Sequence, residues 1–162
     1  MDEKQELLSL LSTDAREDVE DIARQLGTDT ETVESLLDEL ESDGTVRGYQ
    51  AVIDWDNTDS QHVAAFVELN VELDRETGYK EIADRIAKFP EVESLRLVSG
   101  DYDFAIEVTG DSMQDVSQFI SEQIAPIPEI TQTVTHFIME TYKEAGIDFG
   151  DRDDDDRLSV SP

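Results

Sequence analysis

The stretch that decides the fold is VEDIARQLGTDTETVESLLDELESDGTVRGY, residues 19–49, with Asp18 before it as a helix cap. Four apolar residues recur at helical spacing and stop at Gly27, a residue type that commonly ends helices: Val19, Ile22, Ala23 and Leu26. After a short polar turn the helical spacing returns and stops at Gly44, in Val33, Leu36, Leu37 and Leu40. Two short helices joined by a turn of three or four residues predict a helix-turn-helix.

The segments on either side complete a small domain. The helix that stops at Gly44 has two candidate starts. Thr28 with Glu31 has the spacing of a capping box, and Asp29 is the alternative N-cap. Residues 45–53, TVRGYQAVI, follow at once and predict a β-wing. Residues 2–12 predict a first helix with an apolar face made by Leu7, Leu8, Leu10 and Leu11. We therefore expect an α-α-α-β-β domain over residues 1–53, a winged helix-turn-helix.

The charge balance is extreme. The chain has 41 acidic and 12 basic residues in 162, and its formal net charge is −29. Such a balance opposes binding to nucleic acid or to an anionic membrane in dilute buffer. Two interpretations stay open: an acidic surface that attracts a basic partner, or the composition of a halophilic proteome. The acids are spread along the whole chain, which favours the halophilic interpretation, because a partner-binding tail would concentrate them.

Several kinds of chemistry have no support in the sequence. Cysteine is absent, and the two histidines, His62 and His136, are too far apart in sequence to suggest a metal site. No GxSxG motif or glycine-rich phosphate loop occurs. No apolar run approaches 18 residues, and the N-terminal residues contain no apolar h-region. We expect no catalytic residue, no metal, no cofactor and no membrane partner, and a cytoplasmic location.

The hydrophobic period changes after a polar linker at residues 54–61. Over residues 62–143 the pattern predicts strand, helix, strand, strand, helix, strand. The expected strands cover residues 63–73, 92–99, 102–108 and 130–142, and the expected helices cover residues 79–87 and 113–124. This βαββαβ order predicts a ferredoxin-like domain, an antiparallel sheet with both helices on one face. The fold class is therefore α+β.

The last strand suggests self-association. One side of it is predicted to hold Thr131, Thr133, Thr135, Phe137 and Met139, and the other Ile130, Val134 and Ile138. Neither side is purely charged, so both sides are expected to meet protein, although the helices can cover only one. We predict that the other side of the sheet joins a second subunit in a dimer or a larger oligomer. Residues 144–162, with four consecutive aspartates, predict an acidic disordered tail.

Three motifs carry a resemblance to a known family. The first motif, ARxxxxDIARQLG, spans residues 15–27 and contains Ala15, Arg16, Ile22, Ala23 and Gly27. The helix end and wing, LxxDGTVRGYQAVID, place Leu40, Gly44, Val46, Gly48, Tyr49 and Val52. A third motif, VSGDYDFAIEV, places Gly100, Tyr102 and Asp103 at a turn between the middle strands. With the order of the two domains, these motifs resemble the Lrp/AsnC (feast/famine) family of regulators, here of a halophilic archaeal type, over residues 2–143.

The resemblance implies a sequence-specific transcription regulator that binds double-stranded DNA, self-associates and responds to a small effector such as an amino acid. Members of the family usually carry several basic residues in the recognition helix, the second helix of the helix-turn-helix. This chain departs from that pattern, because it has no Lys or Arg from Gly27 to Gly44. The remaining candidates for DNA contact are Arg16, Arg24, Thr30, Thr32, Ser35 and Arg47. For each arginine, an ion pair with a neighbouring acid is an equally good explanation.

An amino-acid effector needs an acceptor for its ammonium group and donors for its carboxylate. The turn and the last strand offer both, and the candidate effector residues are Ser99, Gly100, Asp101, Tyr102, Asp103, Thr133 and Thr135. The alternative is a tight turn whose glycine and aspartates serve backbone geometry alone.

Two other functions stay open. The chain can be a ligand-sensing or interaction subunit that has lost direct DNA binding and modulates a more basic paralogue. It also resembles the sirohaem decarboxylases in its two-domain order, but the region around its middle strands lacks the histidines typical of those enzymes. We therefore expect a regulator and not an enzyme.

Overall fold

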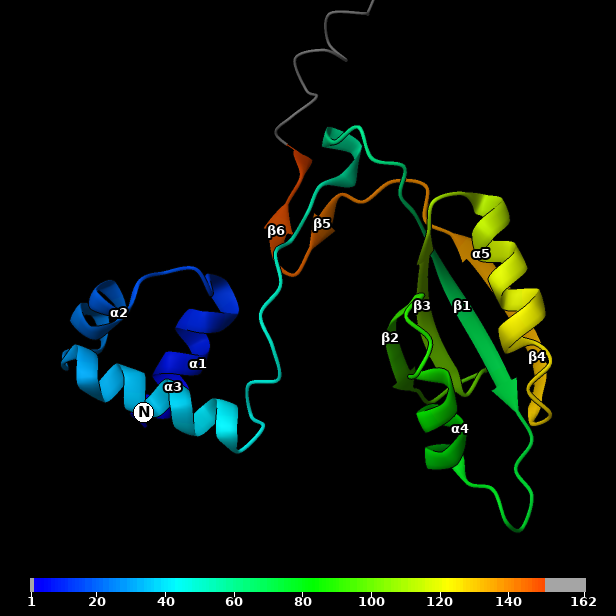
Figure 1. The fold of residues 1–162 in the computed structure, drawn as a ribbon, viewed down its shortest axis with the longest axis horizontal. Coiled ribbons are helices and arrows are strands. Elements are labelled where there is room, and N and C mark those ends of the chain that lie inside the picture. Colours follow the sequence, from blue (N-terminus) through cyan, green and yellow to red (C-terminus); the bar gives the residue numbers. More distant parts are fainter. Residues whose placement is uncertain (1, 151–162) are drawn as a thin grey trace, which may run out of the picture. The chain divides into compact units, whose positions relative to one another are not determined.

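The computed structural model describes residues 2–150, which fall into two compact units (Figure 1). One unit contains residues 2–53 together with residues 143–148, and we call it the helical unit. The other contains residues 54–142 together with residues 149–150, and we call it the sheet unit. Each unit has its own hydrophobic core.

The helical unit is built from three α-helices, as the periodicity predicts: α1 (Glu3–Thr13), α2 (Val19–Leu26) and α3 (Thr30–Ser42). The Asp18 side chain accepts a hydrogen bond from the Asp21 amide at the start of α2, at 2.8 Å. Gly27, with φ of 68°, ends α2 in the left-handed conformation that favours glycine. Asp29, rather than Thr28, is the N-cap of α3.

The three helices meet in a small core. Five side chains are almost fully buried there: Leu7, Ile22, Ala23, Val33 and Leu40. Leu36, Leu37 and Val46 are half-buried against this cluster. The apolar seam predicted from the spacing therefore exists, and it holds α2 and α3 as a helix-turn-helix.

The predicted β-wing strands are wrong for this structure, because residues 45–53 contain no assigned strand. The start of the segment instead folds back onto the C-terminal end of α3. Gly44 has φ of 78°, and the Val46 amide donates to the Leu40 carbonyl at 2.9 Å, so Val46 folds back onto the helix. Farther along, the Tyr49 hydroxyl donates to the Glu41 carboxylate at 2.9 Å. These contacts tie residues 46 and 49 to the C-terminal end of α3.

A hairpin does form where the sequence predicted the start of the acidic tail. Strands β5 (Lys143–Glu144) and β6 (Ile147–Asp148) pair antiparallel through a turn in which Ala145 has φ of 48° and Gly146 has φ of 81°. Two positive φ values are typical of a type I′ turn. The prediction of a tail from residue 144 is therefore wrong for residues 144–148. The aspartate run at residues 153–156 lies outside the described residues.

The sheet unit has the predicted βαββαβ order. Its strands are β1 (Val63–Val71), β2 (Val92–Leu97), β3 (Phe104–Gly110) and β4 (Ile130–Phe137), and its helices are α4 (Tyr79–Ile86) and α5 (Met113–Phe119). The sheet order is β2-β3-β1-β4, and every neighbouring pair is antiparallel. This arrangement is the ferredoxin-like topology, and it confirms the predicted fold class.

Both helices contribute to one core beneath a single face of the sheet. Ala65, Val67 and Leu69 of β1 are fully buried there, in one cluster with Ile82 of α4 and Val116 of α5. The second predicted helix changes geometry: a π-helical turn, η2 (Ile120–Ile124), follows α5 directly. The wider turn keeps Ile120 and Ile124 buried in the same core.

The other side of the sheet, which we call the open face, carries Phe66 and Glu68 of β1 with Val134 and His136 of β4. These residues alternate with those that face the core, and they lie opposite one another in the β1–β4 register. A register shift at Asn70 and Val71 places Ile130 opposite Val71, and both pack against the core. The prediction that Ile130 shares a face with Val134 is therefore wrong, because the irregularity resets the alternation.

The linker before β1 contains a 3-10 turn, η1 (Trp55–Asn57). The Trp55 ring stacks on His62, with ring centroids 4.3 Å apart and an interplanar angle of 16°. Trp55 thus packs against its own unit. Within residues 2–150, no helix is long and apolar enough to cross a membrane.

Candidate functional site

The outward face of α3 is acidic. Glu31, Glu34 and Asp38 are exposed and spaced three and four residues apart, so they lie along one side of the helix. The opposite side carries Val33 and Leu40, which are buried in the core. In a helix-turn-helix, the exposed side of the second helix is the one that enters the major groove of DNA.

Four other acids at the ends of α3 already have partners. The Asp29 carboxylate accepts from the Thr32 amide at 2.7 Å, and this bond lowers the pKa of Asp29 below its ordinary value. Lys4 of α1 forms an ion pair with Glu39, at 2.5 Å. Glu41 accepts from Tyr49, and Asp43 accepts from the Thr45 amide at 2.8 Å. These four carboxylates therefore stabilise the helix and its flanks.

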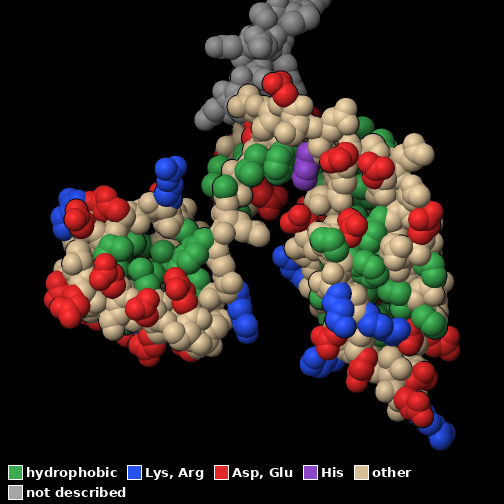
Figure 2. All heavy atoms as spheres, in the orientation of Figure 1, with side chains coloured by type: hydrophobic (Ala, Val, Ile, Leu, Met, Phe, Trp, Pro, Cys, Tyr) green, Lys and Arg blue, Asp and Glu red, His purple; other side chains and the backbone are tan. Residues whose placement is uncertain are grey.

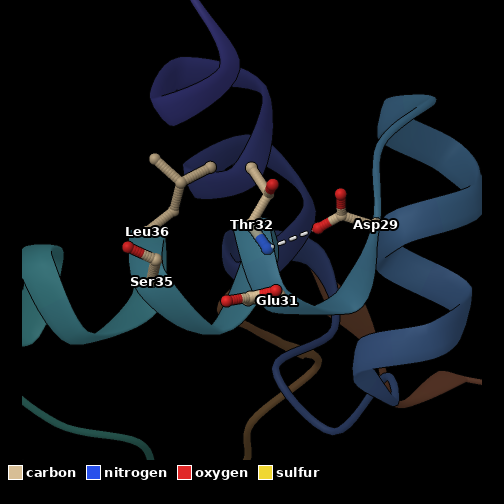
Figure 3. A pocket seen from close by; sticks show the side chains of 5 residues that line it. All are labelled: Asp29, Glu31, Thr32, Ser35 and Leu36. Atoms are coloured by element: carbon tan, nitrogen blue, oxygen red, sulfur yellow. Dashed lines mark hydrogen bonds between the residues drawn. The ribbon is translucent and has the colours of Figure 1, made fainter.

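A shallow hollow lies at the start of α3 (Figure 3). It is lined by Asp29, Glu31, Thr32, Ser35 and Leu36. Two of the predicted DNA-contact residues, Thr32 and Ser35, thus lie together there, and the exposed Thr30 precedes them on the first turn. Their hydroxyl groups are short donors beside carboxylates, a setting suited to polar contacts with a base edge.

The three candidate arginines differ. Arg24 forms an ion pair with Asp21 one turn earlier in α2, although its side chain stays 77 % exposed. Arg47 places its guanidinium beside Gly44 at the end of α3, where an added Cβ would lie 3.2 Å from its Cζ. Arg16 is exposed in the α1–α2 connection, and its amide donates to Asp14. Of the three arginines, Arg24 thus forms the ion pair with a neighbouring acid that was the alternative to a DNA contact.

The turn between β2 and β3 contains most of the predicted effector residues. Gly100 has φ of 119°, which favours glycine, and Ser99 and Asp101 are exposed. The Asp103 carboxylate accepts from the Val71 amide at 2.9 Å, and the Asp103 amide donates to the Leu69 carbonyl at 2.9 Å. Asp103 therefore ties the turn to the end of β1, which is the structural role that the alternative interpretation gave to this turn.

Thr133 and Thr135 lie on a different side of the sheet from Tyr102. They pair with Leu69 and Val67, so they face the helices, where both are half-buried. The Tyr102 ring instead makes an edge contact with Phe66 of the open face, with centroids 6.2 Å apart. The structure therefore brings residues 99–103 together but separates them from the two threonines within one subunit.

A pair that the sequence did not indicate lies on the open face. His136 Nε2 and Glu68 Oε2 are 2.5 Å apart, and the His136 ring lies beside Phe66, with centroids 6.1 Å apart. Their contact depends on the register between β1 and β4, which joins residues 68 positions apart, so no local motif signals it. Among residues 2–150 no group of three or more His, Asp or Glu side chains is placed to hold a metal ion.

Charge is distributed over both units. Figure 2 shows Asp and Glu side chains on the visible face of each unit, with fewer Lys and Arg side chains among them. The helix-turn-helix and the ferredoxin-like unit, in this order along the chain, define a class of two-domain proteins with an N-terminal helix-turn-helix and a C-terminal antiparallel sheet.

Comparison with known proteins identifies the family. The model of the Lrp/AsnC ligand binding domain matches residues 64–147. A Bacillus subtilis protein described as an uncharacterized HTH-type transcriptional regulator, YugG, is 39 % identical over 97 % of this chain and 95 % of its own length. The chain belongs to the Lrp/AsnC family of transcriptional regulators.

Solved structures agree with this fold. The leucine response regulatory protein LrpA of Mycobacterium tuberculosis superposes with a TM-score of 0.74 at 25 % identity, covering 90 % of this chain and 96 % of that one. The transcriptional regulator NMB0573 of Neisseria meningitidis, solved with L-Met, gives a TM-score of 0.71 at 18 % identity, covering 89 % and 92 %. Since the family consists of transcriptional regulators, the chain is a regulator and the decarboxylase hypothesis is rejected.

Proposed function

We propose that this regulator binds double-stranded DNA directly, with α3 in the major groove. The observation that carries the proposal is the intact seam of Val33 and Leu40, which fixes α3 on α2 and leaves its other side exposed. Thr30, Thr32 and Ser35 would contact base edges or nearby phosphates, and Arg16, Arg24 and Arg47 would contact the backbone from outside the helix.

Genome-wide occupancy of the protein in its host, followed by gel shifts in molar KCl with the enriched fragments, tests this function. We expect discrete sites and a retarded band that the Arg47→Gln variant weakens on every fragment alike, because a phosphate contact carries little sequence information. Fragments that are not enriched serve as controls. Failure to find any enriched site would contradict direct DNA binding.

We further propose an amino-acid effector at residues 99–103 of the sheet unit. NMB0573 was solved with L-Met, which shows the class of ligand that a protein of this fold accepts. The exposed Asp101 carboxylate is available for an ammonium group, whereas one oxygen of Asp103 already accepts from Val71. Thr133 and Thr135 would contribute only through a second subunit. Calorimetry with the common amino acids in molar KCl tests the proposal, and absence of heat with all of them would contradict it.

The chain is also proposed to act as a dimer or larger oligomer in the cytoplasm of a halophilic archaeon. Its net charge of −29 produces strong self-repulsion at low salt, whereas in molar salt the Debye length falls to about 3 Å. Sedimentation and thermal unfolding across a KCl series test both parts. We expect an oligomer and a midpoint temperature that rises with KCl; a monomer, or a midpoint independent of KCl, would contradict the corresponding part.

One observation favours a second candidate function. The exposed side of α3 carries Glu31, Glu34 and Asp38 and no cation, a charge that suits a basic protein partner better than phosphate. In this alternative the chain senses a ligand and modulates a paralogue that binds DNA. Purification of the tagged protein from its host distinguishes the two: a basic family member recovered with it, and no DNA sites of its own, would favour the alternative.

A further inference from the structure

The open face of the sheet carries side chains of both charges around an apolar centre. Residues directly opposite one another in antiparallel strands share a face, so the strand registers define two rows that cross β2, β3, β1 and β4 in turn. One row is Arg96, Ala105, Glu68 and Val134, and the other is Ser94, Glu107, Phe66 and His136. Both helices of the sheet unit contribute to the core on the other face, so neither of them covers these rows.

The two rows are joined at one side by the pair of His136 and Glu68. His136 Nε2 lies 2.5 Å from Glu68 Oε2, and the two side chains are 54 % and 25 % exposed. His136 is on an outer strand, and within Ile130–Phe137 it is the one titratable side chain. Glu68, on β1, is the charged group that faces it directly.

The other charged or titratable groups of this region are of types that keep their charge near neutral pH. Tyr102 contacts Phe66, and Glu93 contacts Thr109 on the same side of the sheet. The remaining groups are Arg96 and Glu107 of the two rows, and Glu140 and Tyr142 after β4. Carboxylic acids, tyrosine and arginine ordinarily titrate outside the range from pH 6 to pH 8, whereas histidine changes its charge there.

Resting on the proposed self-association, we propose that a second copy of the chain covers the open face and that this assembly takes up a proton at His136 in each subunit. Charge complementarity favours a second copy. The outer strands carry Arg96 and His136, whereas the inner strands carry Glu107 and Glu68. A face with both signs can pair with itself, as a two-fold interface requires, whereas a purely basic or acidic partner would meet like charge.

The cost of burying Glu68 gives the direction of the pH dependence. In a two-fold interface the Glu68 carboxylates of both subunits leave water together. Beside a neutral histidine each remains an unneutralised charge, which is costly to bury, whereas beside a protonated histidine it belongs to an ion pair. Self-association is therefore strongest at a pH where His136 is protonated, and it weakens as rising pH removes the proton. Salt screens the pair little, because its 2.5 Å separation is below the Debye length of about 3 Å in molar salt.

Sedimentation equilibrium of the full chain in molar KCl between pH 6 and pH 8 tests the proposal. We expect the dissociation constant to rise roughly tenfold over this range. His136→Gln cannot be protonated, so it should associate weakly at every pH and lose the pH dependence. Glu68→Gln should lose the tightening at pH 6, because the protonated His136 is then the unpaired charge.

The matched control is His62→Gln, at the other of the two histidines, which stacks on Trp55. It should keep the pH dependence of the unsubstituted chain. The α-amino group also titrates near pH 8, but every variant retains it. Circular dichroism at each pH checks that the variants are folded.

Two outcomes would overturn the proton uptake while leaving self-association intact. One is an oligomer whose dissociation constant does not change with pH, and the other is a pH dependence that His136→Gln retains. If the unsubstituted chain is a monomer at every pH, the proposed self-association fails, and the proton uptake fails with it.

Discussion

The helical unit and the sheet unit are covered by the same kind of acidic surface, yet they are held together differently. Among the described residues the helical unit buries five side chains in its core, and the sheet unit buries twelve. Helices satisfy their backbone hydrogen bonds locally, so the helical unit can form with a small core. The sheet unit depends on pairings far apart in sequence, such as β1 with β4.

This difference indicates which substitutions should destabilise each unit. In the helical unit one lost core side chain removes a large part of the apolar contact that orients α3. The sheet unit has a larger core, and single side chains at the ends of its strands, such as Asp103, add hydrogen bonds that hold neighbouring segments together.

The largest effects are expected from cavities in the two cores. Leu40→Ala and Ile106→Ala, at residues 2 % and 1 % exposed, should each lower the free energy of unfolding by about 3 kcal/mol. Far-UV circular dichroism follows both units, whereas the single tryptophan, Trp55, belongs to the sheet unit. Leu40→Ala should shift the dichroism transition without a matching shift in tryptophan fluorescence. If both signals shift equally, the cores are not separate.

A smaller loss is expected where Asp103 holds the end of β1. Asp103→Ala removes the acceptor of the Val71 amide, and it should destabilise the sheet unit by about 1–2 kcal/mol. Asp101→Ala is the matched control, because Asp101 is exposed in the same turn and makes no hydrogen bond among the described residues. Urea unfolding followed by Trp55 fluorescence measures both. Equal effects would show that the Asp103 bond does not contribute.

In the helical unit the corresponding change is at the N-cap of α3. Asp29→Ala should lower the midpoint temperature by a few degrees. Because the Thr32 amide lowers the pKa of Asp29 in the folded state, its stabilisation is present above pH 3.8 and is lost as the pH falls through the folded pKa. The difference between Asp29→Ala and the unsubstituted protein should therefore become smaller at low pH, although the protonated carboxyl group can still accept from the Thr32 amide. A difference that is as large at low pH as at neutral pH would contradict a contribution from the charge of Asp29.

The smallest effect concerns the ring stack before β1. His62→Ala removes the partner of Trp55 and should cost about 0.5 kcal/mol, the low end for an aromatic pair. The emission of Trp55 should change in intensity while the transition of the helical unit stays in place. A shift of the dichroism transition as large as that of Leu40→Ala would show that Trp55 does not report on the sheet unit alone.

The open face illustrates how far sequence patterns extend. Alternation predicted that the sheet has a second, partly apolar side, and Phe66 and Val134 lie there. It could not predict that His136 meets Glu68, since that contact needs the register of two strands from opposite ends of the domain. The irregularity at Asn70 and Val71 is a further such feature, and it moved Ile130 to the core side.

In the candidate sites, too, some features follow from the sequence pattern and others depend on how the strands pair. The outward row of Glu31, Glu34 and Asp38 follows from helical spacing alone, and the absence of Lys and Arg from α3 follows from the sequence. The predicted effector set did not hold together as one site in the subunit, because pairing placed Thr133 and Thr135 towards the helices. The β5–β6 hairpin was missed because Ala-Gly is a weak turn signal: alanine disfavours the positive φ that Ala145 adopts.

By itself the sequence determined the three helices of the helical unit, the βαββαβ order of the sheet unit, the cap at Asp18 and the acidic character of α3, since each depends on residues a few positions apart. Only the tertiary structure decided which acids are occupied, which side of the sheet each β4 residue faces, and that Asp103 binds the end of β1. These features depend on contacts between distant segments, and a change of one residue in register reverses the face that a side chain occupies.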